Sequence, residues 1–531
     1  MEEESGATGR PVPTDAAALP RHFGLIFASL MTAMLLAALD QTIVSTALPT
    51  IVGELHGVKH MAWVTTAYIL AATISMPVYG RLGDLLGRKS LFLGAIVVFI
   101  AGSVLAGAAQ NMTVLIIGRA VQGLGGGGLM ITSQAIIADL VPPRQRAKYM
   151  APIGAVFGLA SVIGPLLGGW LTDLAAWRWA FWINLSLGIV ALAVSAFALR
   201  LPSKAAKATI DYMGITLMAV AVSCTVLVTM WGGTEYDWSD PIILGLVAGA
   251  ISAWAAFFIV ETRAAEPVIP PRLFASRIFN ISTLIGMVVI GVGMFAVIGY
   301  MPTYLQMVYG VSATESGLLL IPMVVGIIVT AIPSGQFISK TGRYKMWPVL
   351  GSSVVTVTAL LMSTLGTDTP LVVVGAYFFL MGAGVGMMQQ TLVLAVQNDA
   401  PGRDVGTATS SNNFFREIGA TLGTAAIGAV FTHRLTEQLA DRIPVAATEA
   451  VGRTESLTPA AVHALPAEIQ DAVILSYQQA LTPVFGYLVP VFAAGLVLAF
   501  FLPEKKLADS FAEPEKGGLE TEIPAGGPTR A

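Results

Sequence analysis

Apolar runs long enough to cross a bilayer follow one another along nearly the whole chain. The hydrocarbon core of a bilayer is about 30 Å thick, so a crossing helix needs roughly 20 apolar residues. By that measure the sequence predicts fourteen spans, at residues 23–48, 62–80, 90–109, 112–138, 149–171, 178–200, 211–231, 241–260, 280–305, 316–338, 346–366, 370–396, 405–432 and 481–502. We therefore expect an all-α polytopic membrane protein.

The small number of charged residues excludes other classes of protein. Only 11% of the 531 residues are charged, whereas soluble domains usually carry about 25%, so a soluble enzyme is excluded. A net charge of -3 provides no basic surface for phosphates, so no nucleic-acid partner is expected. The single cysteine, Cys224, provides neither a disulfide framework nor a cysteine-based metal site, and no metal is expected.

Lysine and arginine are distributed unevenly between the predicted loops. If the N-terminus is cytoplasmic and the spans alternate, most of the 29 Lys and Arg residues fall in cytoplasmic segments. The segments on the other side hold only Lys59, Arg178, Arg434, Arg442 and Arg453. The positive-inside rule therefore predicts a multi-pass protein of the cell (inner or plasma) membrane with both termini in the cytoplasm.

A repeated sequence indicates two similar halves. Residues 80–89 follow the second span and residues 335–343 follow the tenth, and each segment places Gly and Gly-Arg seven residues apart. Parallel halves of this kind are typical of transporters that hold substrate between them near the bilayer midplane. The expected domains are a cytoplasmic tail (1–22), a six-helix bundle (23–200), a linker with two additional spans (201–279), a second six-helix bundle (280–502) and a cytoplasmic tail (503–531).

The second bundle is expected to carry an extracellular loop at residues 433–480. Its last part, Ile469–Phe485, is amphipathic, which predicts a helix on the membrane surface. Packing on that surface is the plainer interpretation, and a lid that collects substrate is the alternative.

Two charged residues inside predicted spans lie at similar depths. Asp40 is roughly 26 Å from the cytoplasmic edge and Arg119 roughly 10 Å from the outer edge, at 1.5 Å per helical residue. Charges within a span are costly and mark functional sites. Two hypotheses stay open: the residues form a structural ion pair that never titrates, or Asp40 is a desolvated carboxyl that exchanges a proton for a substrate.

Asp84 lies in the first copy of the repeat, between two predicted helices. A carboxylate at this place is suited to bind the positive N-terminal end of a neighbouring helix and so to latch one conformation. A solvated loop acid is the alternative interpretation. The second copy has Ser339 at the same place, so the latch is expected on one side only.

Further candidates lie in the fifth and thirteenth spans. The run Gly164, Pro165, Gly168 and Gly169 predicts a bent helix that another helix approaches closely. Glu417 is a candidate second titrating or cation-binding carboxylate, or else a structural partner of another buried group. Its neighbour Arg416 need not pair with it, because adjacent helical residues point about 100° apart. The possible cavity residues are Gln41, Gln122 and Arg416.

Over residues 22–502 the sequence resembles the major facilitator superfamily, and within it the fourteen-span drug:proton antiporter family. Residues 39–44 and 47–49 resemble the first-span signature, and 80–91 resemble the loop motif, with Gly80, Asp84, Gly87 and Arg88 in place. The span-4 motif is matched by Leu115, Arg119, Gln122, Gly123 and Gly125, and the span-5 antiporter motif by Gly164, Pro165, Gly168 and Gly169. Two positions depart from the motifs: Ala160 replaces a usual glycine and Leu85 a frequent arginine.

The resemblance implies a major facilitator fold of two six-helix bundles plus two additional helices, and a monomer that is not an enzyme. It further implies multidrug efflux and antibiotic resistance: export of amphipathic, cationic compounds in exchange for protons, driven by the proton gradient without any cofactor. Asp40, Arg119 and Glu417 would couple proton and substrate, and Asp84 would stabilise one conformation. The alternative cargo is an endogenous lipid, a siderophore or a self-made antibiotic.

Overall fold

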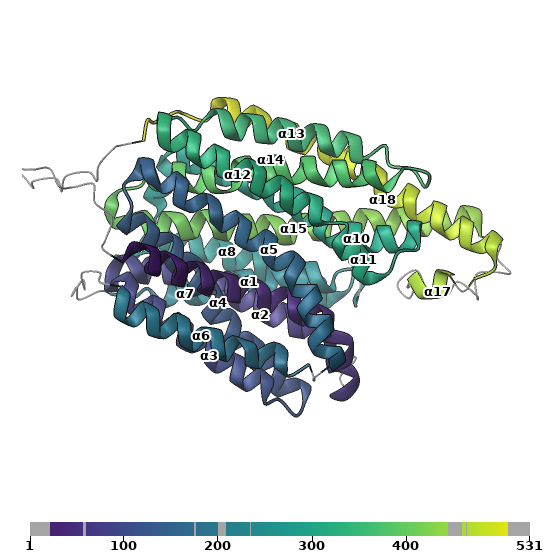
Figure 1. Cartoon of the computed structure of the whole chain (residues 1–531), viewed down its shortest axis with the longest axis horizontal. Coiled ribbons are helices and arrows are strands. Elements are labelled where there is room, and N and C mark those ends of the chain that lie inside the picture. The colour runs from purple at the N-terminus through teal and green to yellow at the C-terminus, as the bar shows by residue number, and fades with distance from the viewer. Residues whose placement is uncertain are drawn as a thin grey trace, which may run out of the picture.

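The computed structural model describes residues 22–56, 60–174, 177–199, 209–233, 235–443, 459–463 and 465–507. Long helices lying roughly side by side make up almost all of this part (Figure 1). Most of the two predicted tails (residues 1–21 and 508–531), residues 200–208 and residues 444–458 of the predicted loop lie outside the described residues. We call the end of the bundle where the first helix begins and the last one ends the terminal end, and the opposite end the far end.

Six helices form the first half, in chain order α1 (Phe23–Glu54), α2 (Met61–Leu86), α3 (Arg88–Gly107), α4 (Met112–Leu140), α5 (Pro143–Leu174) and α6 (Trp179–Ala198). The additional pair follows, α7 (Tyr212–Trp231) and α8 (Pro241–Glu261), with a short 3₁₀ turn, η2 (Pro271–Ala275). The second half consists of α9 (Arg277–Ile285), a π turn η3 (Gly286–Gly291), α10 (Val292–Tyr309), α11 (Ala313–Leu318), α12 (Ile321–Thr341), α13 (Met346–Met362), α14 (Leu371–Asp399), η4 (Gly402–Asp404), α15 (Val405–Arg442), α17 (Pro459–His463) and α18 (Ala467–Phe501).

Each predicted span has a helix at its place. Thirteen helices within the described residues are long and apolar enough to cross a membrane, and the remaining predicted span corresponds to α13, an apolar helix of 17 residues. The all-α polytopic fold is therefore confirmed. The count of fourteen spans and the domain boundaries stay predictions.

The predicted surface helix at Ile469–Phe485 is wrong. These residues are the first half of α18, which continues without interruption to Phe501, and α15 extends beyond the predicted end of its span to Arg442. Val473 and Tyr477 of α18 are buried in the same cluster as Leu439 of α15. The stretch is amphipathic, as predicted, but its apolar face packs on a neighbouring helix.

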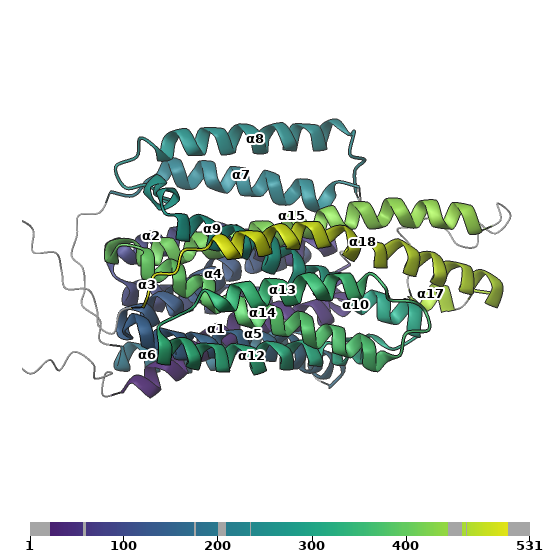
Figure 2. The ribbon, with the colours of Figure 1, turned by 90° about the horizontal axis from the view of Figure 1, so that it is seen from above.

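The additional pair lies beside the two halves, with α7 between α8 and the rest of the bundle (Figure 2). Buried Met218, Val222 and Val226 of α7 pack in one cluster with Phe414 and Ile418 of α15. Partly buried residues of α2 (Leu70, Ile74 and Val78) join the same cluster. The pair therefore covers the seam where α2 of the first half meets α15 of the second.

The sequence repeat corresponds to a repeated helix crossing. Gly87 and Gly342 have φ of 97° and 71°, values that favour glycine, and they end α2 and α12. A Cβ at Gly80 of α2 would overlap Ser410 of α15, and a Cβ at Gly335 of α12 would lie 2.5 Å from the backbone oxygen of Ala147 of α5. Each repeat glycine thus lets a helix of one half approach a helix of the other at the terminal end.

Candidate functional site

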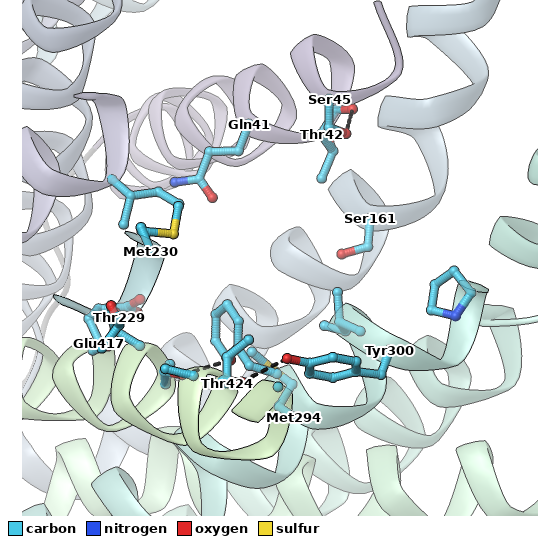
Figure 3. A pocket seen from close by; sticks show the side chains of 18 of the residues that line it. Gln41, Thr42, Ser45, Ser161, Thr229, Met230, Met294, Tyr300, Glu417 and Thr424 are labelled. Atoms are coloured by element: carbon cyan, nitrogen blue, oxygen red, sulfur yellow. Dashed lines mark hydrogen bonds between the residues drawn. The ribbon is translucent and has the colours of Figure 1, made fainter. Parts of the chain in front are cut away.

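A cavity of about 1380 Å³ lies between the two halves. The first half contributes α1, α2 and α5 to its walls, the second contributes α10, α12 and α15, and α7 adds residues at one side. The walls are mainly apolar or small, with hydroxyl and amide groups among them, as Figure 3 shows for Gln41, Thr42, Ser161 and Thr424. The exposed His433 is part of the lining, so the cavity reaches the surface at the far end.

Three acidic or basic side chains belong to the part of the cavity lining that the structure describes: Arg416, Glu417 and His433, of which Glu417 alone is a carboxylate. Nη2 of Arg416 lies 3.3 Å from Oε1 of Glu417. Adjacent helical residues need not pair, but both of these side chains are long, and here they do. The Glu417 side chain remains 20% exposed, and it is part of the cavity lining.

The structure brings Asp40 and Arg119 together. Asp40 is fully buried, and its Oδ2 accepts a hydrogen bond from Nη1 of Arg119. Its Oδ1 accepts from Nε2 of Gln122 and from Nδ2 of Asn184, both at 2.8 Å. The guanidinium of Arg119 also lies 4.3 Å from the ring centre of Tyr68. The carboxylate is thus enclosed by donors from α4 and α6.

The Asp40 network lies behind the cavity wall rather than in it. Gln41 faces the cavity, whereas neither Asp40 nor Arg119 is part of the lining. Gln122, which the sequence analysis assigns to a possible cavity, binds Asp40 and the hydroxyl of Ser103 instead. The position of a residue along a helix does not give the direction in which its side chain points. The prediction that Gln122 faces a cavity is therefore wrong. No sequence signal marked Asn184 as a partner of Asp40.

Asp84 joins the two halves at the terminal end. Its carboxylate accepts hydrogen bonds from the backbone N–H groups of Gly406 (3.1 Å) and Thr407 (2.7 Å) and from the Thr407 hydroxyl (2.8 Å). These groups lie in the first turn of α15, so the carboxylate meets the positive end of that helix. Nη2 of Arg88 lies 2.9 Å from Oδ1 of Asp84, and Nη1 of Arg88 lies 3.0 Å from Asp139.

The second crossing is held by different chemistry. Arg144, in the first turn of α5, donates from Nε to the carbonyl of Ser339 (2.9 Å) and from Nη2 to the carbonyl of Lys340. These carbonyls belong to the last turn of α12, where a cation is favoured. Ser339 provides no carboxylate, as the sequence indicates, but the expectation of a one-sided latch is wrong because Arg144 closes the second side.

A buried acid that the sequence analysis did not identify connects the linker to α15. Asp404, fully buried, accepts hydrogen bonds from Nε and Nη2 of Arg272 (2.9 and 2.8 Å) and from Nη1 of Arg81 (3.2 Å). Arg81 also pairs with Glu266 of the linker. The hydrogen bonds to Asp404 raise the pKa of Arg272. No motif marked Arg272 and Asp404 as partners, since 132 positions separate them.

The glycines of α5 differ in their surroundings. A Cβ at Gly164 or Gly168 would overlap the hydroxyl of Thr42 or Thr46 of α1, so these two glycines permit the close approach of α1. A Cβ at Gly169 would meet no atom within 4 Å, so the expected packing role does not apply there. Pro165 lies within the same helix. Among the described residues, no group of three or more His, Cys, Asp or Glu side chains is placed to hold a metal ion.

Comparisons with known proteins agree with this architecture. The protein-family model of the Major Facilitator Superfamily matches residues 30–424. An uncharacterized MFS-type transporter of Mycobacterium tuberculosis is 43% identical over 92% of this chain and 71% of its own length. Multidrug transporter protein MdtP of Bacillus subtilis is 39% identical over 93% of this chain and 95% of its own length. The acurin A biosynthesis cluster MFS-type transporter of Aspergillus aculeatus is 34% identical over 79% of this chain and 77% of its own length.

A solved structure shares the fold. The crystal structure of the human organic anion transporter MFSD10 (TETRAN) superposes on this chain with a TM-score of 0.60 at 15% sequence identity. The superposition covers 90% of this chain and 99% of the MFSD10 chain. At this level of identity the likeness concerns the fold alone.

Proposed function

This chain belongs to the Major Facilitator Superfamily and is an efflux transporter of small molecules in a lipid bilayer, not an enzyme, and on that premise we propose that it exports amphipathic, cationic compounds in exchange for protons. The protein works as a monomer in the cell membrane, with both termini in the cytoplasm and the proton gradient as its source of energy. The observation that carries the proposal is the large apolar cavity with Glu417 as the carboxylate among its described lining residues.

The cavity walls suit an amphipathic molecule. Apolar side chains such as Met76, Phe157 and Ile327 bury hydrocarbon or aromatic surface, at about 25 cal/mol per Å² of apolar area. Glu417 supplies a negative charge beside them, and its side chain remains 20% exposed although it pairs with Arg416. The name of the relative MdtP, a multidrug transporter, is consistent with a cavity that accepts many such compounds.

Proton and cation compete for Glu417 in this proposal. Asp40 is enclosed by Arg119, Gln122 and Asn184 and has no contact with the cavity in this conformation. That enclosure supports the structural hypothesis for the Asp40–Arg119 pair. Binding of a proton to Glu417 releases the cation to the outside, and loss of the proton on the cytoplasmic side prepares the carboxylate for the next cation.

Alternating access follows from the two ends of the bundle. The terminal end is closed by Asp84 and Arg144, while the cavity reaches the far end, so the conformation is outward-facing under the predicted topology. Exchange of one proton for one monovalent cation moves no net charge, so the pH gradient alone drives it, at about 1.4 kcal/mol per pH unit. A neutral substrate would also use the membrane potential, about 2.3 kcal/mol per 100 mV.

Proton movement in proteoliposomes tests this proposal. Ethidium is added to vesicles that contain the native protein, Glu417→Gln or Asp40→Asn, and an internal pH dye records proton flux. We expect flux from the native protein and none from Glu417→Gln. The matched control is Glu437→Gln, which removes an exposed acid from the same helix and should preserve the flux. Flux that is retained in Glu417→Gln and lost in an Asp40→Asn protein that still binds ethidium would transfer the exchanging role to Asp40. No flux with any lipophilic cation would overturn the proposal.

The second candidate function is export of an endogenous lipid, siderophore or self-made antibiotic on the same fold. The relative named for the acurin A biosynthesis cluster favours it, since that name associates a protein of this family with a biosynthetic cluster. Deletion of the gene separates the two functions. Unchanged drug sensitivity together with a missing envelope lipid or secreted metabolite would support the second candidate and contradict the first.

A further inference from the structure

The additional helix pair lies outside both six-helix halves, yet α7 reaches the cavity. Val226, Thr229 and Met230 near the end of α7 are part of the cavity wall, and so is Trp238 in the turn that follows. Figure 3 shows Thr229 and Met230 among the side chains around the pocket, together with Gln41 of α1 and Glu417 of α15. A helix pair that served only to link the halves would not need to contribute to this wall.

The turn after α7 holds an indole ring in a fixed place. Gly233 has φ of 75° and its N–H donates to the carbonyl of Tyr236 at 2.8 Å. A Cβ at Gly232 or Gly233 would lie 2.7 Å from atoms of the Trp238 ring. Only glycine therefore allows the indole to lie against this backbone. Trp231 packs edge-on against Trp63 of α2, with ring centres 5.8 Å apart, which anchors the turn to the first half.

The position of α7 between α2 and α15 explains why it reaches the cavity. Thr66 and Ile69 of α2 line one flank, and Thr421 and Thr424 of α15 line another. Buried Val226 of α7 packs with Phe414 and Ile418 of α15 and with partly buried residues of α2. Because α2 and α15 belong to different halves, α7 completes the wall at the seam between them.

Two large apolar side chains of this segment are partly exposed. Met230 is 37% exposed and Trp238 is 46% exposed. An indole presents a flat face that stacks with other rings, and the methionine thioether adapts its shape to aromatic surfaces. Both lie on the wall of the cavity that Glu417 also lines, so this cavity offers an apolar face for a flat ring system and a carboxylate for a positive charge.

We propose that α7 and its following turn form a part of the binding site that selects substrates with flat aromatic ring systems. This inference rests on the proposed export of amphipathic cations. Met230 and Trp238 contact the rings, Thr229 contacts their edge, and the positive charge is directed to Glu417. Cations with linear alkyl chains use the same carboxylate without this aromatic contact.

Cysteine protection tests the contact directly. Cys224→Ser removes the single cysteine of the chain, and Met230→Cys or Thr229→Cys then introduces a reporter on α7. The matched control is Ser239→Cys, an exposed position in the same turn that is not part of the cavity lining. At ethidium concentrations about ten times its Kd, alkylation of a reporter in contact with ligand should slow about tenfold. The control rate should not change.

Substitution of the aromatic face gives a second measurement. Trp238→Ala should weaken ethidium binding about threefold to tenfold, as expected for loss of an aromatic contact, and leave the binding of a linear alkylammonium unchanged. Met213→Ala, at an exposed position near the other end of α7, is the control. A native protein that exchanges ethidium for protons but shows no protection of either reporter would overturn this inference and leave the proposed function intact. A native protein that neither binds nor exports any lipophilic cation would overturn both.

Discussion

The carboxylate of Asp84 accepts a hydrogen bond of 2.7 Å from the backbone N–H of Thr407, a residue 323 positions further along the chain. Asp84 is at the end of α2 in the first half, and Thr407 is in the first turn of α15 in the second. This bond, with those to Gly406 and to the Thr407 hydroxyl, ties the halves together at the terminal end. The cavity can open toward that end only when these bonds are broken.

We therefore expect Asp84→Asn to favour opening of the terminal end. A charge at a helix N-terminus in a partly buried place contributes up to about 2 kcal/mol, so its loss shifts the equilibrium by up to about thirtyfold. Ser334→Cys in a Cys224→Ser background reports the change, because Ser334 of α12 is 2% exposed in the closed conformation. Its alkylation by a charged maleimide should become faster in Asp84→Asn.

Asp139→Asn is the matched control for this prediction. It removes another carboxylate that pairs with Arg88, but that pair lies between α3 and α4 of the first half. The alkylation rate of the reporter should then stay near that of the parent. Equal rates for Asp84→Asn and the parent would contradict the assigned role of Asp84 as a latch.

The crossing of α2 and α15 depends on the absence of a side chain at Gly80. A Cβ there would overlap Ser410 Oγ and lie 2.8 Å from the carbonyl oxygen of Gly406. Overpacking of this kind costs about 1–3 kcal/mol. Gly80→Val should therefore hold the terminal end open and abolish export, while binding of the cation from the cytoplasmic side persists.

Gly94→Val serves as the control for that variant, since a Cβ at Gly94 of α3 meets no atom within 4 Å. Export by Gly94→Val should equal that of the native protein. Addition of Ser410→Gly to Gly80→Val removes one of the two overlaps and should restore part of the export. Native activity in Gly80→Val would show that the close approach is not required.

The fold was predictable from sequence because the bilayer sets the length of each apolar run. The prediction failed at Ile469–Phe485, where an amphipathic pattern fits both a helix on lipid and a helix packed on another helix. The packing of Val473 and Tyr477 of α18 with Leu439 of α15 distinguishes the two. The repeat at residues 80–89 and 335–343 predicted two similar halves, and the structure has a close helix crossing at Gly80 and another at Gly335.

The candidate site was harder to predict from the sequence than the fold. Equal depth predicted that Asp40 and Arg119 could meet, since depth follows from counting residues along a helix. The direction of a side chain around its helix does not follow from such counting. This direction places Gln41 in the cavity lining and Gln122 behind the cavity wall. Long-range partners such as Asn184 carry no local signal, because a lone asparagine in an apolar run fits many surroundings.

The Asp40–Arg119 pair allows the structural and titrating hypotheses to be distinguished. Asp40→Asn leaves Arg119, 1% exposed, without its charge partner, and removal of one member of a buried pair costs about 3–5 kcal/mol. We expect a large loss of thermal stability in detergent. The double variant Asp40→Asn with Arg119→Gln removes both charges and should regain most of that stability.

Proton flux in the double variant decides between the hypotheses. If the pair is structural, the double variant regains ethidium-dependent proton flux together with its stability, and this is the outcome we expect. A stable double variant that binds ethidium without moving protons would instead identify Asp40 as the exchanging group. Thermal unfolding and flux are measured on the same preparation, so loss of fold and loss of coupling are separated.

At the far end, Glu54 gives the first half a dependence on pH. It accepts hydrogen bonds from Arg178 and from Nε1 of Trp177 (2.6 Å), and the bond from Arg178 is the main cause that lowers the pKa of Glu54 below its ordinary value of 4.5. A lowered folded pKa contributes stability that is present above pH 4.5 and is lost as pH falls through the folded pKa. The contribution is small, because the Glu54 side chain is 48% exposed.

Unfolding temperatures at pH 7 and pH 3.5 test this dependence. The native protein should lose more stability than Glu54→Gln over that interval, because the variant has no carboxylate to protonate at this place. Arg178→Gln should reduce the difference in the same way, since it removes the donor that holds the pKa down. An identical pH response in all three proteins would mean that the contact between α1 and the start of α6 does not depend on the charge of Glu54.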